Sequence, residues 1–496
     1  MTRRSFSTNV ALTLFATVTP ALAAALTLPT LYRLLGADRL GVLTLAWVAI
    51  GSCALLDAGL GRALTHETSQ LLARDRAADI RPLVKGSLLL LGAIGATATL
   101  GIVLGADAIV SRLHAAGALG PEIRTTLLVC AAAVPLMTVS AGIRGVLEAY
   151  GRFDMTSLVR VTLGAATYLG PWLAVRSYNS LVLAVAAIVA ARFVSVVVLY
   201  VFMESTLGAP VVASVSAWPE VRRTLAGGIW MTLAGVAGAA LTVVDRLILG
   251  AMVSLAAIAF YSTPQELIGK LTLVPMALSA VLFPALSAAA ARESNDLTRL
   301  FTRGIRYTFA LVFPLAAVGA GLANEWLGLW LGKDFALPSH HVAQWFCLSV
   351  LLQSLAVTPL NLLQAAGRAH VTAWLQLAQL PIFIAAVWYA VSVAGIAGAA
   401  FVWAARMLLD LSLLLWLSSR YSPGLLGPIR SWSAGIGLAV IFFVAMTRFD
   451  SLMARGTLLA VGLSLFAASL PRLIGHDDLA QFRALAARHL SRQAQA

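Results

Sequence analysis

Charged side chains are scarce in this sequence of 496 residues. Asp, Glu, Lys and Arg make up 11% of it, whereas hydrophobic residues make up 60% and the mean hydropathy is +0.89. Average globular domains carry about 25% charged residues, so this composition excludes a water-soluble protein. Apolar stretches of about 20 residues recur along the chain, which is the length that a helix needs to cross a bilayer. The sequence therefore predicts an all-α polytopic membrane protein.

Cysteine is also scarce, and the usual cofactor motifs are missing. The chain has three cysteines, Cys53, Cys130 and Cys347, all in apolar stretches and none in a CxxC or Cys/His spacing that suits a metal. We therefore predict packing roles for them, with no metal site and no cofactor. The absence of a Walker motif argues against ATP as a direct driver.

Basic residues outnumber acidic ones, giving a formal charge of +14. They punctuate the apolar runs instead of gathering on one face, so they predict membrane topology and no nucleic-acid partner. We count fourteen apolar spans. When alternate loops are assigned to opposite sides, 23 Lys and Arg residues fall on one side and nine on the other, and three lie inside spans. The positive-inside rule then predicts that both termini are cytoplasmic.

The two halves of the sequence resemble each other. Residues 35–37 (Leu-Gly-Ala) recur at 249–251, and residues 147–152 (LEAYGR) recur as LQAAGR at 363–368. Ala-Ala-Arg at 190–192 recurs at 404–406, so all three matches have offsets of 214 to 216. Because the repeat contains six spans, an even number, the two copies have the same orientation in the membrane. We predict two six-helix lobes with parallel pseudo-two-fold symmetry, 1–210 and 211–420, followed by two extra helices and a basic tail in 421–496.

Several charged residues lie within or beside the apolar spans, where a charge costs on the order of 3 kcal/mol. In one interpretation Arg62 extends to the cytoplasmic face while Asp57 caps the helix or pairs with Arg62; in the other, both face a cavity. Asp245 and Arg246 form either an ion pair at the membrane interface or part of a substrate site. Glu266 and Lys270 stand at i and i+4 on one helix face, which permits a cavity lining or a structural ion pair. The candidate cavity residues are Arg33, Asp57, Arg62, Asp245, Arg246, Glu266 and Lys270. We assign Arg160, Arg192, Arg406 and Asp410 to topology, near helix ends.

Specific stretches of this sequence resemble one protein family. Residues 31–41 (LYRLLGADRLG) and 55–64 (LLDAGLGRAL) resemble the N-terminal signature of Wzx-type polysaccharide flippases in the multidrug/oligosaccharidyl-lipid/polysaccharide superfamily. Residues 145–153, 244–250, and 261–262 through 284–287 add further matches. The resemblance covers about the first 420 residues. It implies a twelve-helix, two-lobed fold like that of the MATE exporters, and the extra pair of helices is shared with the lipid II flippase branch.

The resemblance also implies a function. The expected substrate is an undecaprenyl-pyrophosphate-linked oligosaccharide, moved from the cytoplasmic to the periplasmic leaflet of the inner membrane. Arg33, Arg62, Arg246 or Lys270 would contact the pyrophosphate, while the lipid tail stays in the bilayer. Membrane lipids, a polysaccharide polymerase and chain-length machinery are the expected partners. No covalent chemistry is implied, so an enzyme is not expected.

Two rival functions are open. The first is a cation-coupled multidrug exporter of the same superfamily, which usually relies on a carboxylate in the first helix, and residues 10–31 contain none. The second is a membrane polysaccharide polymerase or glycosyltransferase, which needs catalytic carboxylates or His on a large external loop. The longest external connections, near 106–124 and 323–341, are short, and His340-His341 is a weak metal or interface signal.

Overall fold

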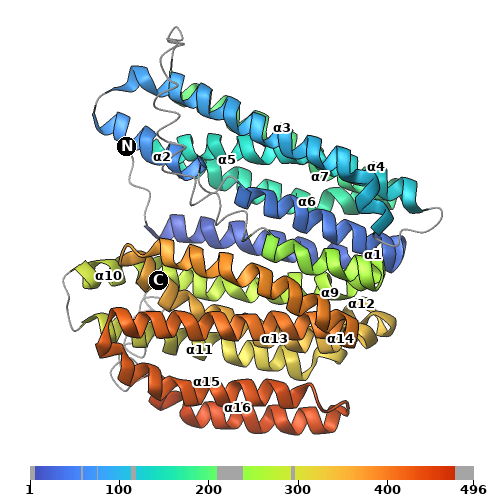
Figure 1. The fold of residues 1–496 in the computed structure, drawn as a ribbon, viewed down its shortest axis with the longest axis vertical. Helices are drawn as coiled ribbons and strands as arrows, with labels where there is room; N and C mark the ends of the chain where they lie inside the picture. Colours follow the sequence, from blue (N-terminus) through green and yellow to red (C-terminus); the bar gives the residue numbers. More distant parts are fainter. Residues whose placement is uncertain are drawn as a thin grey trace, which may run out of the picture. The chain divides into compact units, whose positions relative to one another are not determined.

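The structure is a computed structural model in which every regular element of the described residues is a helix (Figure 1). It describes residues 6–56, 60–74, 76–112, 119–208, 238, 240–291 and 296–474. The helical structure of these residues confirms the predicted all-α fold class. A further helix covers residues 240–252. The elements are α1 (Phe6–Leu56), α2 (Leu60–Ala73), η1 (Ala77–Asp79), α3 (Ile80–Arg112), α4 (Leu119–Ala131), α5 (Ala133–Ala149), α6 (Phe153–Tyr178), α7 (Leu181–Leu207), α9 (Leu255–Ile268), η3 (Gly269–Thr272), α10 (Leu273–Ala291), α11 (Asp296–Gly321), α12 (Ala323–Leu331), α13 (Lys333–Ala365), α14 (Ala369–Tyr421), η4 (Pro423–Leu425), α15 (Leu426–Met446) and α16 (Leu452–Ile474).

Ten helices in the described part of the chain are long and apolar enough to cross a membrane. Two elements are too long for a single membrane crossing, since α1 has 51 residues and α14 has 53. Their lengths are about 75 to 80 Å, whereas the hydrocarbon core of a bilayer is about 30 Å thick. Each is interrupted by one glycine with positive φ, Gly36 at 73° and Gly395 at 56°. These breaks lie where the sequence predicts connections between spans. The total of fourteen spans stays a prediction.

The predicted repeat has a local structural counterpart where α5 and α13 end. Gly151 and Gly367 have φ of 72° and 73° and are 216 residues apart. At each, the glycine N–H bonds back to the carbonyl three residues earlier, Glu148 and Gln364. The next N–H in each copy, that of an arginine, reaches the carbonyl five residues earlier at 2.9 Å. This is the Schellman helix end, which favours glycine because only glycine adopts that backbone without strain.

The repeat continues beyond this turn. Helix α6 begins at Phe153 and α14 begins at Ala369, again 216 residues later. The next left-handed residue is Asn179 in the first copy, with φ of 47°, and Gly395 in the second. These also differ by 216. The kink inside α14 therefore corresponds to the α6–α7 junction, which agrees with a duplicated architecture.

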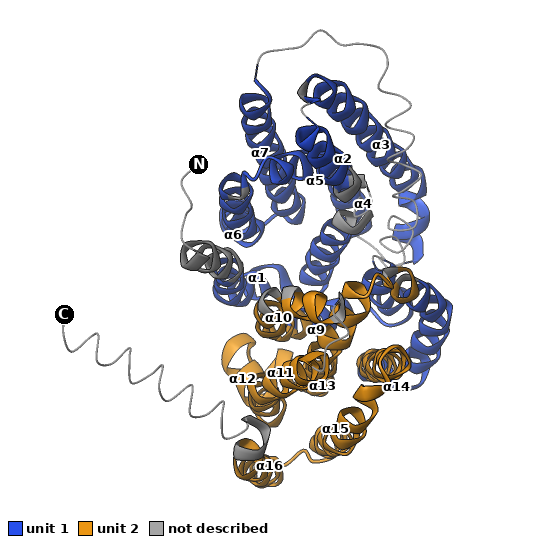
Figure 2. Cartoon of the chain, turned by 90° about the vertical axis from the view of Figure 1, so that its left-hand side faces the viewer, with its two compact units in different colours: residues 1–263, 373–399 blue, residues 264–372, 400–496 orange. Residues whose placement is uncertain are grey.

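The chain divides into two compact units (Figure 2). The first unit contains residues 1–263 and 373–399, and the second contains 264–372 and 400–496. The predicted lobe boundaries at 210 and 420 stay a prediction.

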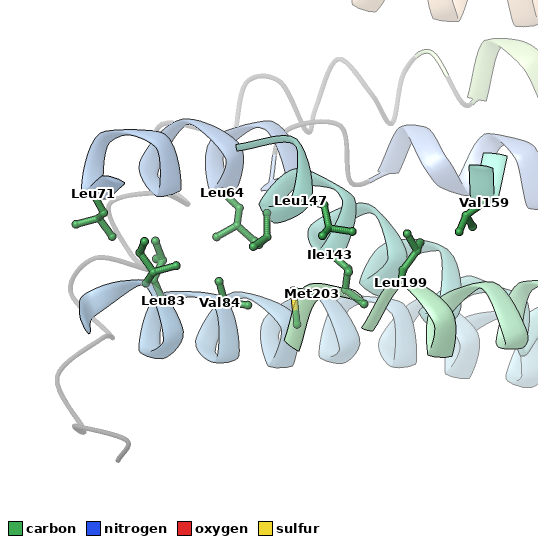
Figure 3. Packing of buried hydrophobic residues seen from close by; sticks show 11 residues of the cluster. Leu64, Leu71, Leu83, Val84, Ile143, Leu147, Val159, Leu199 and Met203 are labelled. Carbon is green, nitrogen blue, oxygen red and sulfur yellow. The ribbon is translucent and has the colours of Figure 1, made fainter. Parts of the chain in front are cut away.

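In the first unit, helices α2, α3, α5, α6 and α7 share an apolar core. Figure 3 shows side chains from these helices pointing toward one another, among them Leu64 of α2, Val84 of α3 and Ile143 of α5. Val159 of α6 and Leu199 of α7 complete the cluster, at 7% and 1% exposed. This core fixes α5, α6 and α7 against one another and thereby determines where their polar side chains lie.

The second unit has an aromatic core that includes the last two helices. Phe309 and Phe313 of α11 stack with ring centroids 5.0 Å apart. Phe313 also packs against Phe443 of α15 and Phe466 of α16, with centroids 6.2 and 5.2 Å away. The two helices predicted to lie outside the repeat therefore pack on α11 through aromatic rings, which prefer such tilted and edge contacts.

Close packing in the first unit predicts the effect of one substitution. A β-carbon added at Gly41 of α1 would lie 2.0 Å from the backbone oxygen of Leu255, which begins α9. We expect Gly41→Ala to lower stability by about 1–3 kcal/mol, because a backbone atom has to move. Gly51→Ala on the same helix is the matched control, since nothing lies within 4 Å of its added carbon. The control is expected to be neutral or to stabilise by up to about 1 kcal/mol. Thermal unfolding of both purified variants makes the comparison, and equal midpoints would contradict the packing.

Candidate functional site

Asp245 and Arg246 are buried on the helix of residues 240–252, at 0% and 5% exposed. They belong to the first unit. An ionised group removed from water is costly unless a partner compensates it. The surroundings of these two side chains therefore decide whether the pair is tolerated.

A compact polar network surrounds this pair. Arg246 Nη1 lies 2.9 Å from Asp245 Oδ1, and the Tyr261 hydroxyl donates to Asp245 Oδ2 at 2.7 Å. Arg246 Nε donates to Ser262 Oγ at 3.2 Å, and Nη1 donates to the Thr242 carbonyl. The network joins the helix of residues 240–252 to α9. Two stretches of the sequence that carry the family resemblance, residues 244–250 and 261–262, thus meet through side-chain contacts.

The same helix and α9 are both tied to α1 by further polar contacts. The hydroxyls of Ser52 and Thr242 lie 3.0 Å apart. The Asp38 carboxylate accepts a hydrogen bond from the Ala256 backbone N–H at 3.0 Å. Arg39, next to Asp38, forms an ion pair with Glu122 of α4 at 3.0 Å. The N-terminal signature of residues 31–41 therefore contributes structural contacts just after the α1 break at Gly36.

Glu266 and Lys270 pair as their spacing predicts. Lys270 Nζ lies 2.5 Å from Glu266 Oε1. The Lys270 side chain is 30% exposed and the Glu266 side chain is 31% exposed. Glu266 lies near the end of α9, whereas Lys270 lies in η3, the 3₁₀ turn between α9 and α10. A stretch of 3₁₀ between two α-helices often marks a hinge. The pair thus stands in the second unit at an interruption of the helical path.

The other predicted site residues have different settings. Arg33 is exposed on α1. Arg62 lies on α2, and Asp57 lies outside the described residues. The structure therefore brings Asp245 to Arg246 and Glu266 to Lys270. The roles of the seven residues in a substrate site stay a prediction.

A cavity of about 190 Å³ lies inside the first unit, between α5, α6 and α7. Its lining includes three arginines, Arg144 of α5, Arg160 of α6 and Arg192 of α7. The Arg192 guanidinium also contacts the Met137 sulfur at 2.7 Å. We call this the arginine cavity. None of its three arginines is among the seven candidate residues from the sequence.

The assignment of Arg192 to a helix end is wrong. Arg192 stands eleven residues after the first residue of α7 and fifteen before the last. No charged residue stands close to it in the sequence to indicate a pairing partner. Arg144, Arg160 and Arg192 come together only when three helices pack. The available sequence signal was a charge in the middle of an apolar span, which marks a functional candidate by default.

Three residues of the second unit come near enough to share a cation. The ligand atoms of His340, His341 and Asp450 all lie within 4.8 Å of one another. His341 Nδ1 lies 3.0 Å from Gln344 Oε1, and its Nε2 lies 3.8 Å from Asp450 Oδ1. The Asp450 side chain is 86% exposed. Exposed groups of this kind are as readily explained by a His–carboxylate ion pair as by a metal site.

Sequence comparison relates the chain to proteins of polysaccharide biosynthesis. Residues 30–340 match the family model described as "Polysaccharide biosynthesis protein". A Shigella flexneri protein named "Putative O-antigen transporter" is 25% identical over 407 residues, covering 82% of this chain and 96% of that protein.

Comparison of folds gives the same architecture. The lipid II flippase MurJ, in an inward closed conformation, aligns with a TM-score of 0.67 and 12% identity over 94% of this chain and 98% of its own. An inward-facing multidrug resistance MATE family transporter of the MOP superfamily aligns with a TM-score of 0.65 and 13% identity, covering 87% and 99%. At these identities the likeness establishes the fold. It confirms the predicted MATE-like, MurJ-like helical architecture.

Proposed function

Because this chain belongs to the polysaccharide biosynthesis protein family, as a Wzx-type flippase of the MOP superfamily, we propose that it moves lipid-linked oligosaccharides across the inner membrane. The substrate is an undecaprenyl-pyrophosphate-linked repeat unit, delivered from the cytoplasmic to the periplasmic leaflet for surface polysaccharide assembly. The observation that carries the proposal is the match to the Shigella flexneri relative over four fifths of the chain.

The physical task of such a protein is to carry a charged headgroup past hydrocarbon. An isolated ionised group in a medium of low dielectric constant costs on the order of tens of kcal/mol, so it cannot cross without a polar path. Buried or half-buried cations occur in both units, Arg192 and Arg246 in the first and Lys270 in the second, and each supplies favourable charge to an anion near it. The lipid tail remains in the bilayer.

The two repeats provide a means of transport by alternating access. Rocking of two similar lobes exposes a central path to each side in turn. The break at η3 between α9 and α10 and the glycine breaks in α1 and α14 are candidate hinges. No bond is made or broken in this process, so neither a nucleophile nor a cofactor takes part. Both termini are cytoplasmic in this proposal, and a polymerase and chain-length machinery receive the product.

A complementation experiment tests the proposed function. A strain from which this gene has been deleted should lose surface polysaccharide and accumulate lipid-linked repeat units, and the full chain should restore the polymer. Immunoblotting of membrane fractions controls for insertion. Unchanged polysaccharide together with increased drug sensitivity would instead identify a multidrug exporter.

A further inference from the structure

Helix α6 provides six of the ten residues that line the arginine cavity. Its lining on that helix extends from Thr156 to Thr167, eleven residues or about 16 Å of helix. A cavity needs about 15 Å³ to hold one water, so about 190 Å³ admits a group of several heavy atoms. Gly164 of this lining packs so closely on Pro20 of α1 that an added β-carbon would lie 2.4 Å from that ring.

Positive charge dominates this lining. Ten residues of the described part of the first unit line the cavity, of which three are arginines and none is acidic. Val159 and Leu199 belong both to the lining and to the apolar core, so the surroundings of the arginines are partly of low dielectric constant. A cationic side chain in such surroundings attracts an anion more strongly than it does in water. An anion in the cavity would gain from this attraction.

The donor set fits phosphate. An arginine presents a planar fork of N–H donors that matches two phosphate oxygens, and it stays charged at any physiological pH. The hydroxyls of Thr156, Thr167 and Ser195 add short-range donors to the same lining. A carboxylate has two oxygens and would be satisfied by one arginine. Three guanidinium groups and three hydroxyls suit a group with more oxygens, such as a phosphate ester or a diphosphate.

The arginines are also graded in depth. Arg144 stands five residues before the end of α5, and Arg160 stands seven residues after the start of α6. Both thus lie near the turn of residues 150–152, which the distribution of basic residues places on the cytoplasmic side. Arg192 lies near the middle of α7. A headgroup that arrives from the cytoplasmic leaflet would meet Arg144 and Arg160 first and Arg192 next.

We propose that the arginine cavity binds the phosphate oxygens of a lipid headgroup, and that the lipid is the diphosphate-linked substrate. The second half of this inference rests on the proposed function. The same chemistry could be offered by the phosphodiester of an anionic phospholipid, so the test separates these two sources.

Binding by the purified full chain tests the site itself. The protein is placed in phosphatidylcholine nanodiscs and titrated with a polyprenyl diphosphate. Replacing Arg160 and Arg192 together with glutamine is expected to weaken binding at least about 10-fold, because two charge-assisted contacts are lost. Arg176→Gln is the matched control, since Arg176 also lies on α6 but contacts Trp172. Thermal unfolding confirms that each variant is folded. Equal affinity of the double variant and the wild type would overturn the site.

Competition identifies the source of the phosphate. Phosphatidylglycerol in excess should leave diphosphate binding unchanged if the cavity takes the substrate. Displacement at equal concentration would overturn the substrate assignment and assign the cavity to a bulk phospholipid. In cells, R160Q/R192Q should reduce surface polymer, and full export despite lost binding would also overturn the substrate assignment. Failure of the wild-type chain to restore any polymer would refute the proposed function, while the nanodisc result would still decide the anion site.

Discussion

Replacing Asp245 with alanine is expected to destabilise the protein by about 3–5 kcal/mol, because it removes one partner of a buried charged pair. The substitution leaves the Arg246 guanidinium, 5% exposed, without the carboxylate that lies 2.9 Å away. It also leaves the Tyr261 hydroxyl without its acceptor at 2.7 Å. Thermal unfolding in detergent, followed by size-exclusion profiles, measures the loss.

Two further variants show whether the charge is responsible. Tyr261→Phe removes one hydrogen bond but keeps the ion pair, so a smaller loss of about 1–2 kcal/mol is expected. Replacing Asp245 and Arg246 together should cost less than the sum of the two single changes, because no lone charge remains buried. If Asp245→Ala were no more harmful than Tyr261→Phe, the buried network would have no special role in stability.

Replacing Lys270 with alanine is expected to abolish export of the polymer while the protein remains inserted in the membrane. The change removes the positive charge in η3 and leaves the Glu266 carboxylate, previously 2.5 Å from Lys270 Nζ, to repel an anionic headgroup. Lys270→Arg keeps the charge and should preserve most export. Surface polysaccharide and the amount of protein in the membrane are measured together.

Lys333 provides the control for this experiment. It is one of three lysines in the chain and is exposed at the start of α13. A strain with Lys333→Ala should export the polymer normally, since this substitution removes the same charge at a position outside the proposed path. Normal surface polysaccharide in a Lys270→Ala strain would exclude Lys270 from the site.

The architecture could be predicted from the sequence because its determinants are local or periodic. Apolar runs indicate spans, and the glycines at 36 and 395 mark the breaks between them. The LEAYGR and LQAAGR motifs form the same Schellman turn around Gly151 and Gly367, since that turn depends on a few consecutive residues. These features need no knowledge of how distant helices pack.

Contacts between helices could not be predicted in the same way. The spacing of Glu266 and Lys270 was sufficient, because both stand on one helical path. Asp245 and Arg246 are adjacent in sequence, but their burial depends on Tyr261 and Ser262, sixteen residues away. The arginine cavity brings together Arg144 and Arg192, which lie 48 positions apart on separate helices. Such sites become visible only when the helices are placed.

The most direct test of the central claim, that this chain moves lipid-linked oligosaccharides across a bilayer, is a flipping assay with purified protein. Vesicles contain a lipid-linked oligosaccharide with a fluorescent headgroup, and dithionite added outside bleaches only the outer leaflet. Wild-type protein should allow bleaching to proceed nearly to completion, whereas empty vesicles and vesicles with Lys270→Ala should stop once the outer leaflet is bleached. Wild-type vesicles that stop at the same level as empty ones would contradict the account.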